Sequence, residues 1–310
     1  MKVRIKFAKY GSMKFIGHLD LMRYFQKVFR MSGIDVKLSQ GYSKHQIMSF
    51  ASPLGIGMTT EGDYMDVELE DKASDANSED GNVKDDNAVD DNAEDNNVKD
   101  YSVKDNRAKD TNIKDHITRR LNDILNDEIR VVDVLKLPDE EKTSMSLLRA
   151  ADYEILVKPE KVNNMLKSFL DLKTRRLNIG SFMEEDNIEI RQVTKKSERT
   201  INLKKYIYLM TADISSFASI SAYDAAKNIY RSGSYIPVMF MRIASGSVIN
   251  IRPDQVVNAF FEYTYMPDPD PPDIQIHRLD MFADLNADKG MMNEVGGEKM
   301  PMFVPLSEYR

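Results

Sequence analysis

The sequence predicts an α+β fold made of two ferredoxin-like halves, each with the element order β-α-β-β-α-β. Short stretches in which apolar and polar residues alternate, typical of half-buried strands, are interleaved with longer stretches that carry an apolar stripe at helical spacing. This order runs through residues 1–140 and recurs, less regularly, through residues 150–285. With 310 residues, 42% of them hydrophobic, the chain is long enough for two cores.

The first half is predicted to comprise residues 1–70 and 116–140. Its first strand, residues 2–8, alternates Val3, Ile5 and Phe7 with basic residues. A helix over residues 17–31 follows, and Gly33 is placed to end it. The remaining elements are predicted to be strands over residues 47–51 and 64–70, a helix over 113–126 and a strand over 129–137.

An acidic insertion interrupts this half at residues 71–115. From residue 76 onward it consists of eight pentads that each end in aspartate, and it holds 14 Asp and Glu against 7 Lys and Arg. A period of five matches neither the strand nor the helix, so no continuous apolar face forms. We therefore expect the insertion to be disordered.

The second half is predicted over residues 150–285, with a C-terminal tail, residues 286–310, expected to be loose. Its elements are predicted to be a strand over 151–157, a helix over 160–172, a hairpin of 188–193 with 200–210, a helix over 253–263 and a strand over 274–279. Residues 213–250 do not fit the six-element scheme. They contain a predicted helix over 222–231 and a predicted strand over 238–243.

Composition excludes several classes of protein. The chain has no cysteine, which rules out disulfides, thiolate zinc sites and the cysteine-held iron–sulfur cluster of a radical enzyme. No histidine and carboxylate spacing matches a metal-binding motif, so neither a metal nor a cofactor is predicted. There is no apolar segment long enough for a membrane span or a signal peptide, and a cytoplasmic location is expected.

Basic residues are concentrated in the N-terminal segment. Residues 1–50 hold ten Lys and Arg against two Asp, although the whole chain has a net charge of −7. Arg23, Lys27 and Arg30 recur at helical spacing and are expected to form one basic stripe, with Lys14 just before the helix. Cations that neutralise phosphates beside exposed aromatic rings are typical of single-stranded RNA binding.

Two histidines occupy polar, glycine-punctuated segments on either side of this first helix. His18 lies at its start beside Asp20, and His45 lies in the loop after it with Gln40, Tyr42 and Lys44. A polar loop between regular elements is a common place for binding or catalysis. Arg252, which precedes Pro253 at a predicted helix start, is a further candidate for phosphate binding.

The run from Lys9 to Gly57 resembles the start of an uncharacterised bacterial family, the DUF2344-like proteins, which is associated with radical S-adenosylmethionine enzymes. The residues that match the family pattern are His18, Leu19, Asp20, Ser39, Gln40, Gly41, Tyr42, His45, Ser49, Phe50, Ala51, Pro53 and Leu54. The chain departs from the pattern at Ser43, Lys44, Gln46 and Ile47, where the family has Asn, Pro, Pro and Lys. The resemblance implies a free-standing protein that works beside a radical enzyme.

Three functions follow from these observations. The first is an accessory module that binds RNA or an RNA-linked substrate beside a radical S-adenosylmethionine enzyme. The second is a hydrolase or nuclease in which His18, His45 and Asp20 form an acid–base set. The third is a structural adaptor that binds a partner protein. Because the chain lacks cysteine, it is not expected to be a radical enzyme itself.

Overall fold

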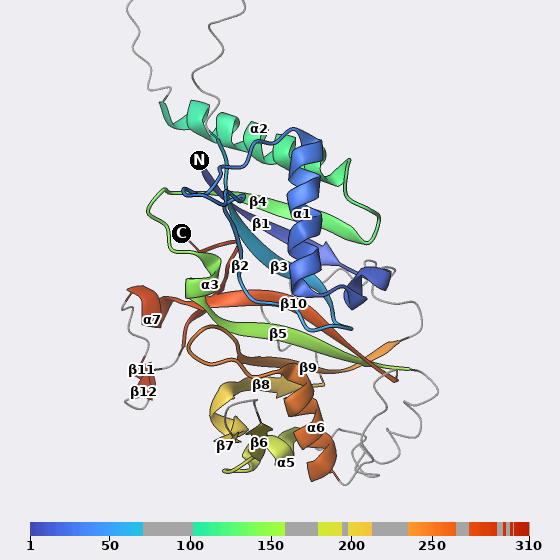
Figure 1. The fold of residues 1–310 in the computed structure, drawn as a ribbon. Coiled ribbons are helices and arrows are strands. Elements are labelled where there is room, and N and C mark those ends of the chain that lie inside the picture. Colours follow the sequence, from blue (N-terminus) through green and yellow to red (C-terminus); the bar gives the residue numbers. More distant parts are fainter. Residues whose placement is uncertain are drawn as a thin grey trace, which may run out of the picture.

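The computed structural model describes residues 1–70, 102–158, 179–193, 198–212, 235–264, 273–289, 294–295, 298–299 and 301–309. Within these residues, six α-helices accompany a mixed nine-stranded sheet and two small two-stranded sheets (Figure 1). The fold class is therefore α+β, as the sequence predicts. No helix among them combines the length and the apolar character that crossing a bilayer requires.

The strands of the first half form one end of the large sheet. They are β1 (Lys2–Lys9), β2 (Met48–Phe50), β3 (Thr59–Glu68) and β4 (Ile129–Leu137). Their spatial order is β4-β1-β3, and β2 pairs with the end of β3. Every pair among them is antiparallel.

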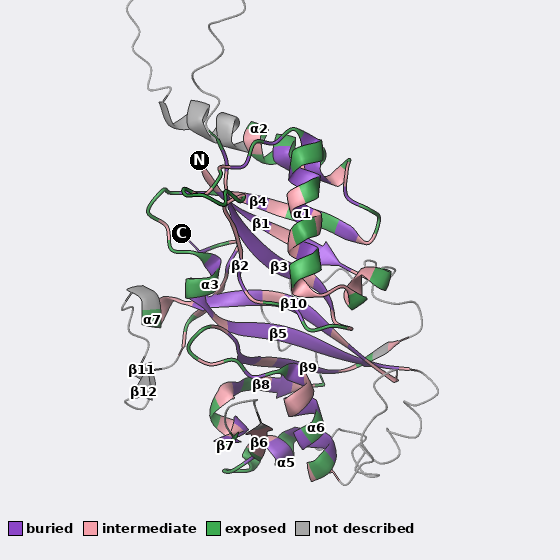
Figure 2. Ribbon diagram, viewed as in Figure 1, coloured by how far each residue is buried: buried purple, intermediate pink, exposed green. Residues whose placement is uncertain are grey.

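Two helices close the core of this half. α1 (His18–Ser32) follows the 3-10 helix η1 (Gly11–Phe15) and ends at Gly33, whose φ of 70° only glycine adopts readily. Its buried residues, among them Phe25 and Phe29, pack with β1, β3, β4 and the second helix, α2 (Ser102–Asn122). Figure 2 shows this division, with the outward side of α1 exposed and the strands beneath it buried.

The start of α2 corrects the predicted extent of the insertion. Residues 102–112 were expected to be disordered, but they belong to α2, which begins eleven residues before the predicted helix of 113–126; residues 71–101 lie outside the described residues. Ile117 and Leu121 anchor the C-terminal part of the helix in the core, and Ile113 packs against it. Once such a turn is fixed, each residue added to the helix needs no new nucleation, so the pentads can continue it without an apolar stripe of their own.

The strands of the second half continue the same sheet. They are β5 (Leu148–Val157), β8 (Ile207–Thr211), β9 (Ile236–Ala244) and β10 (Ile274–Asp284), in the antiparallel order β10-β5-β9-β8. The helices α5 (Ile179–Glu184) and α6 (Pro253–Tyr263) pack on them, and Phe182 contacts Phe260 edge to face. The predicted helices over 160–172 and 222–231 lie outside the described residues.

The predicted hairpin of 188–193 with 200–210 is wrong in its second arm. β6 (Glu189–Val193) pairs with β7 (Glu198–Asn202) in a separate small sheet, and the 3-10 helix η2 (Leu203–Tyr206) then separates β7 from β8. The side chain of Asn202 accepts a hydrogen bond from the Lys204 N–H, and Leu203 is fully buried. This cap and this buried side chain end β7, and the strand that follows, β8, pairs with β9 in the large sheet.

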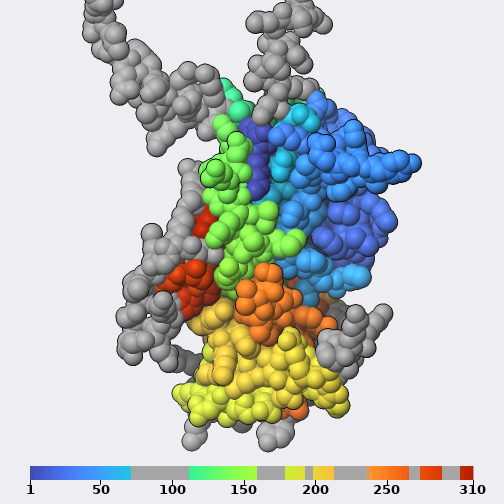
Figure 3. All heavy atoms as spheres, turned by 60° about the vertical axis from the view of Figure 1, so that its left-hand side comes forward, coloured from blue at the N-terminus to red at the C-terminus, as the bar shows by residue number. Residues whose placement is uncertain are grey.

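A parallel contact between β3 and β10 joins the two halves. Thr59 lies opposite His277 and Thr60 opposite Arg278. Nearby, Gly62 faces the β10 backbone so closely that a Cβ there would lie 2.5 Å from the carbonyl oxygen of Leu279. We call this contact and the polar residues around it the seam. Figure 3 shows the first half in blue and green stacked on the second in yellow and orange.

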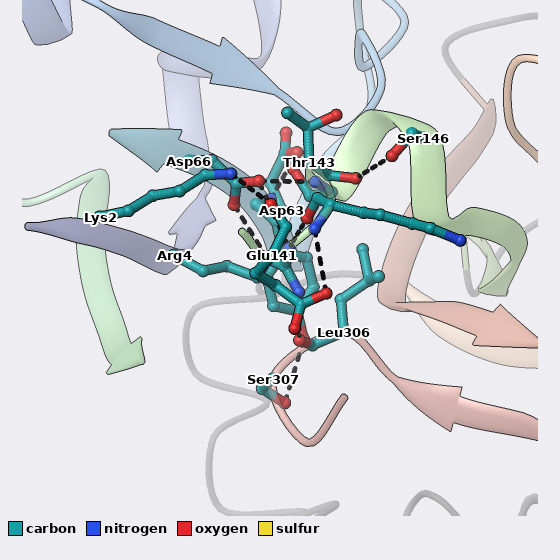
Figure 4. A network of polar contacts seen from close by, with 12 residues as sticks. Lys2, Arg4, Asp63, Asp66, Glu141, Thr143, Ser146, Leu306 and Ser307 are labelled. Atoms are coloured by element: carbon teal, nitrogen blue, oxygen red, sulfur yellow. Dashed lines mark hydrogen bonds and ion pairs between the residues drawn. The ribbon is translucent and has the colours of Figure 1, made fainter. Parts of the chain in front are cut away.

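The alternating pattern of β1 suggests that its polar side faces solvent, but the structure buries part of that side. Arg4 is buried and forms a two-point ion pair with Asp66, at 2.9 and 3.3 Å (Figure 4). It also donates to the carbonyls of Leu306 and Lys142, both at 3.1 Å. The backbone N–H of Ser144, the first residue of α3 (Ser144–Leu147), donates to Asp66 at 2.6 Å.

The C-terminal tail is not loose throughout. α7 (Leu285–Lys289) follows β10, β11 (Glu294–Val295) pairs with β12 (Glu298–Lys299), and β13 (Phe303–Pro305) pairs with β10. Leu306 and Tyr309 are buried. The glycine- and methionine-rich composition that predicts a loose tail is confined to residues 290–302, and the apolar residues at 303–309 bury enough surface to hold the end of the tail.

Candidate binding site

The basic stripe predicted on the first helix is exposed along its length. Arg23, Lys27 and Arg30 lie on the side of α1 opposite its buried residues. Arg23 donates to Asp20 at 3.0 Å, but the two side chains are 70% and 66% exposed. Exposed pairs contribute little free energy, so Arg23 can exchange this carboxylate for a phosphate.

The four candidate residues of the loop after α1 are also exposed. Gln40, Tyr42, Lys44 and His45 all face solvent, and the ring of Tyr42 makes no packing contact that shields it. The loop is held in shape by the Ser39 N–H, which donates to the His45 carbonyl at 2.8 Å, and by Ser39 Oγ, which lies 2.9 Å from His45 Nδ1. The loop therefore holds the Tyr42 ring and the Lys44 cation in an ordered, exposed position.

The structure does not bring His18 and His45 together. His18 packs edge to face against Phe50, at the end of β2, with ring centroids 5.1 Å apart. His45 precedes β2 at its other end, and five residues of extended chain, roughly 16 Å, separate it from Phe50. Asp20 pairs with Arg23 rather than with either histidine. The three residues do not form the acid–base set that the sequence suggested.

Lys14 and Arg252, far apart in sequence, line one cavity of about 1080 Å³ beside the seam. Its walls come from residues 14–15 before α1, from the loop 52–58, from the start of α6 and from residues 274–278 of β10. Tyr153, Lys158 and Arg278 also line it. In Figure 1 the base of α1 and the beginning of β10 meet at the same end of the sheet.

A buried charged cluster supports one wall of this cavity. Arg278 is 1% exposed, and its Nη2 lies 2.9 Å from Asp63 Oδ2. That geometry leaves both Nη2 and Nε without a hydrogen bond among the described residues. Burial raises the pKa of Asp63, while Arg278, the Tyr64 N–H, Lys9 and His18 act in the opposite direction. Burial likewise lowers the pKa of Lys9.

Lys14 is held at the cavity by a neutral partner. Its Nζ donates to Gln275 Oε1 at 2.7 Å and lies 5.2 Å from the centre of the Phe15 ring. The amide of Gln275 is fixed in turn, because its Nε2 donates to the Gly57 carbonyl at 2.8 Å. Partial burial lowers the pKa of Lys14. No carboxylate of the described residues pairs with this cation, which leaves its charge available to a ligand.

Arg252 stands at the entrance to α6. It is exposed, and its Nε donates to Asp254 at 3.1 Å. Lys158, across the cavity, pairs with Asp273 at 3.3 Å. Of these cations the sequence identified Lys14 and Arg252 but missed Lys158 and Arg278. The available signal was the strand IQIHRLD at residues 274–280. A strand that closes a sheet is expected to be apolar on one face, but this one has Gln275 and His277 on one face and Arg278 on the other.

The described residues contain no group of three or more histidine, aspartate or glutamate side chains that could hold a metal ion. A family model described as an uncharacterised protein conserved in bacteria, DUF2344, matches residues 2–81 and 104–253. The match includes α1, the loop after it and most of the cavity wall, but not β10. No curated protein matches the chain.

Proposed function

The chain belongs to the DUF2344 family of proteins conserved in bacteria, and we propose that it is a cytoplasmic module that binds RNA or an RNA-linked substrate beside a radical S-adenosylmethionine enzyme. The radical partner is inferred from the resemblance of residues 9–57 to proteins associated with such enzymes. This partner would supply the iron–sulfur cluster, which requires cysteines that the chain does not have.

The exposed basic stripe of α1 is the observation that carries the RNA proposal. Arg23, Lys27 and Arg30 project from one rigid helix, and only Arg23 has an ion pair, an exposed one, among the described residues. Lys14 and Phe15, which precede α1 in the sequence, line the cavity. Phosphates along the stripe and a base near Phe15 would match the cation and ring pattern of single-strand binding.

We also propose that each half is a ferredoxin-like unit. The orders β4-β1-β3-β2 and β10-β5-β9-β8 are the same once the strands of each half are numbered in turn, with β8 and β9 as the second hairpin. Sheets of this kind serve as RNA platforms in other proteins, which is an analogy of fold.

Replacing Arg23, Lys27 and Arg30 together by glutamine should flatten the salt dependence of RNA binding. Each phosphate contact to a single strand contributes about 0.7 to the slope of log K against log salt, so the slope should fall by about 2. Between 50 and 200 mM salt, the affinity of the parent should drop roughly 20-fold more than that of the variant. Filter binding of an unstructured oligoribonucleotide across a salt series measures both.

The matched control removes three exposed basic residues elsewhere, by the substitution Arg130→Gln, Lys136→Gln and Lys205→Gln. It changes the net charge equally but leaves α1 intact, and its slope should stay within about 0.5 of the parent slope. Equal slopes for the two triple variants would mean that RNA binding depends on the net charge of the protein and not on contacts made by the stripe. Absence of RNA binding by the parent at low salt would favour the protein adaptor.

His45→Ala should act differently from the stripe variants. The ring lies in a polar loop beside the exposed Tyr42, where it would contact a base rather than a phosphate. We expect an unchanged salt slope and an altered ranking of homopolymeric RNAs in competition binding. A ranking identical to that of the parent would remove His45 from the interface.

A further inference from the structure

The cavity beside the seam combines the two kinds of surface that a nucleotide requires. We propose that it is a nucleotide site, in which the cations hold a phosphate and the apolar wall receives the base. This inference deepens the proposed function, because it assigns a nucleotide pocket to the RNA-binding module. At about 1080 Å³ the cavity is large enough for such a ligand.

Positive charge dominates the lining. Lys14, Lys158, Arg252 and Arg278 contribute four cations, and Asp254 is the one acid among the described lining residues. Arg252 already pairs with Asp254 and Lys158 with Asp273. Lys14 has no carboxylate partner among the described residues, and Arg278 has a donor without an acceptor there. A bound phosphate would complete both, because its oxygens accept several charge-assisted hydrogen bonds at once.

Arg278 provides the strongest argument for a ligand. A guanidinium buried to this degree rarely leaves a nitrogen such as Nε without an acceptor, since it costs free energy to desolvate. The ion pair of Nη2 with Asp63 neutralises the charge but leaves Nε unsatisfied. Since Arg278 lines the cavity, an anion bound there would supply the missing acceptors.

The start of α6 lies on the same cavity. Pro253 and Asp254 at its first turn and Val257 one turn later all line the wall. The exposed guanidinium of Arg252, just before α6, and the unsatisfied Nε of Arg278 on β10 place the phosphate between these two elements.

The other side of the cavity is largely apolar. It is formed by the loop 52–58 and by Phe15. Phe15 and Ile56 are 64% and 70% exposed, so a bound base can cover apolar surface there. Rings stack on such rims in single-strand binding proteins, and a stacked base would cover both residues.

Calorimetric titration of the full chain with ribonucleoside 5′-monophosphates tests the proposal. At least one monophosphate should bind, with an affinity at least tenfold above those of its nucleoside and of inorganic phosphate, because both surfaces contribute. Lys14→Gln should weaken binding by about tenfold, the value of one charge-assisted hydrogen bond. Its partner Gln275 is neutral, so no carboxylate is orphaned, and an unchanged urea midpoint would show that the fold is intact.

Lys136→Gln, which removes an exposed lysine on β4, is the matched control and should bind as the parent does. The α1 triple variant should also bind monophosphates normally, which separates this site from the stripe. Failure of every monophosphate to bind at millimolar concentration would overturn the proposal, as would equal binding of inorganic phosphate or an unaffected Lys14→Gln. RNA binding by the stripe alongside any of these results would leave the proposed function standing without the pocket.

The source of the nucleotide is distinguished by competition. A 5′-phosphorylated oligoribonucleotide that displaces the bound monophosphate, where its 5′-hydroxyl form does not, would assign the pocket to the end of an RNA chain. Displacement by neither would assign it to a free nucleotide. Both results support the site, and each names its ligand.

Discussion

Arg4→Met should lower the free energy of unfolding by about 3–5 kcal/mol, the usual cost of removing one partner of a buried ion pair. Methionine replaces the apolar stem of the arginine side chain but leaves Asp66 as an uncompensated buried carboxylate. The carbonyls of Leu306 and Lys142 lose their donors in the same change. Urea unfolding at neutral pH gives the difference in free energy.

The exposed pair of Arg23 with Asp20 offers a matched control, since it joins the same two residue types on the surface. Arg23→Met should change the free energy of unfolding by less than about 1 kcal/mol. Adding Asp66→Leu to Arg4→Met should recover part of the loss, because no buried charge then remains. A loss below 1 kcal/mol for Arg4→Met alone would mean that water or a shifted side chain replaces the guanidinium.

Gly62→Ala should destabilise the protein by about 3 kcal/mol, at the upper end of the usual cost of overpacking. Its Cβ would lie 2.5 Å from the Leu279 carbonyl oxygen and 2.7 Å from Asp280 Cα. Both contacts are with backbone, so no side-chain rotation relieves them, and β3 must move away from β10. The urea midpoint should fall.

Gly180→Ala is the control of opposite sign. Gly180 lies in α5, and a Cβ there meets no atom within 4 Å. Alanine should stabilise the helix by about 0.5 kcal/mol. If the two alanine variants unfold at the same urea concentration, the contact of β3 with β10 at Gly62 is not as tight as the structure has it.

Local signals sufficed where an element carries its own pattern and its own ends. β4 and α6 have the predicted bounds, because β4 alternates and α6 begins at Pro253, where a helix accepts proline. α1 ends before Gly33 for an equally local reason. Each of these elements is determined by residues within a few positions of one another.

The seam and the cavity could not be predicted in this way. Thr59 and His277 pair across more than two hundred residues, and nothing in either segment indicates the other. Alternation places Arg4 on the polar side of β1 but cannot distinguish a solvated arginine from one paired in the interior. The cavity collects residues from segments far apart in the sequence, so only Lys14 and Arg252, next to recognisable helix starts, were candidates.

The bond from Arg4 to the Leu306 carbonyl has a consequence for biosynthesis. The two residues are 302 positions apart. At elongation rates of about 5–20 residues per second, Leu306 is therefore synthesised roughly 15–60 s after Arg4. Strand β10, which completes the sheet beside β3, is also synthesised about two hundred residues after β3. Until then the nascent first half holds an open strand edge and a partly satisfied arginine. The first half therefore completes its own contacts only after the second half has been synthesised.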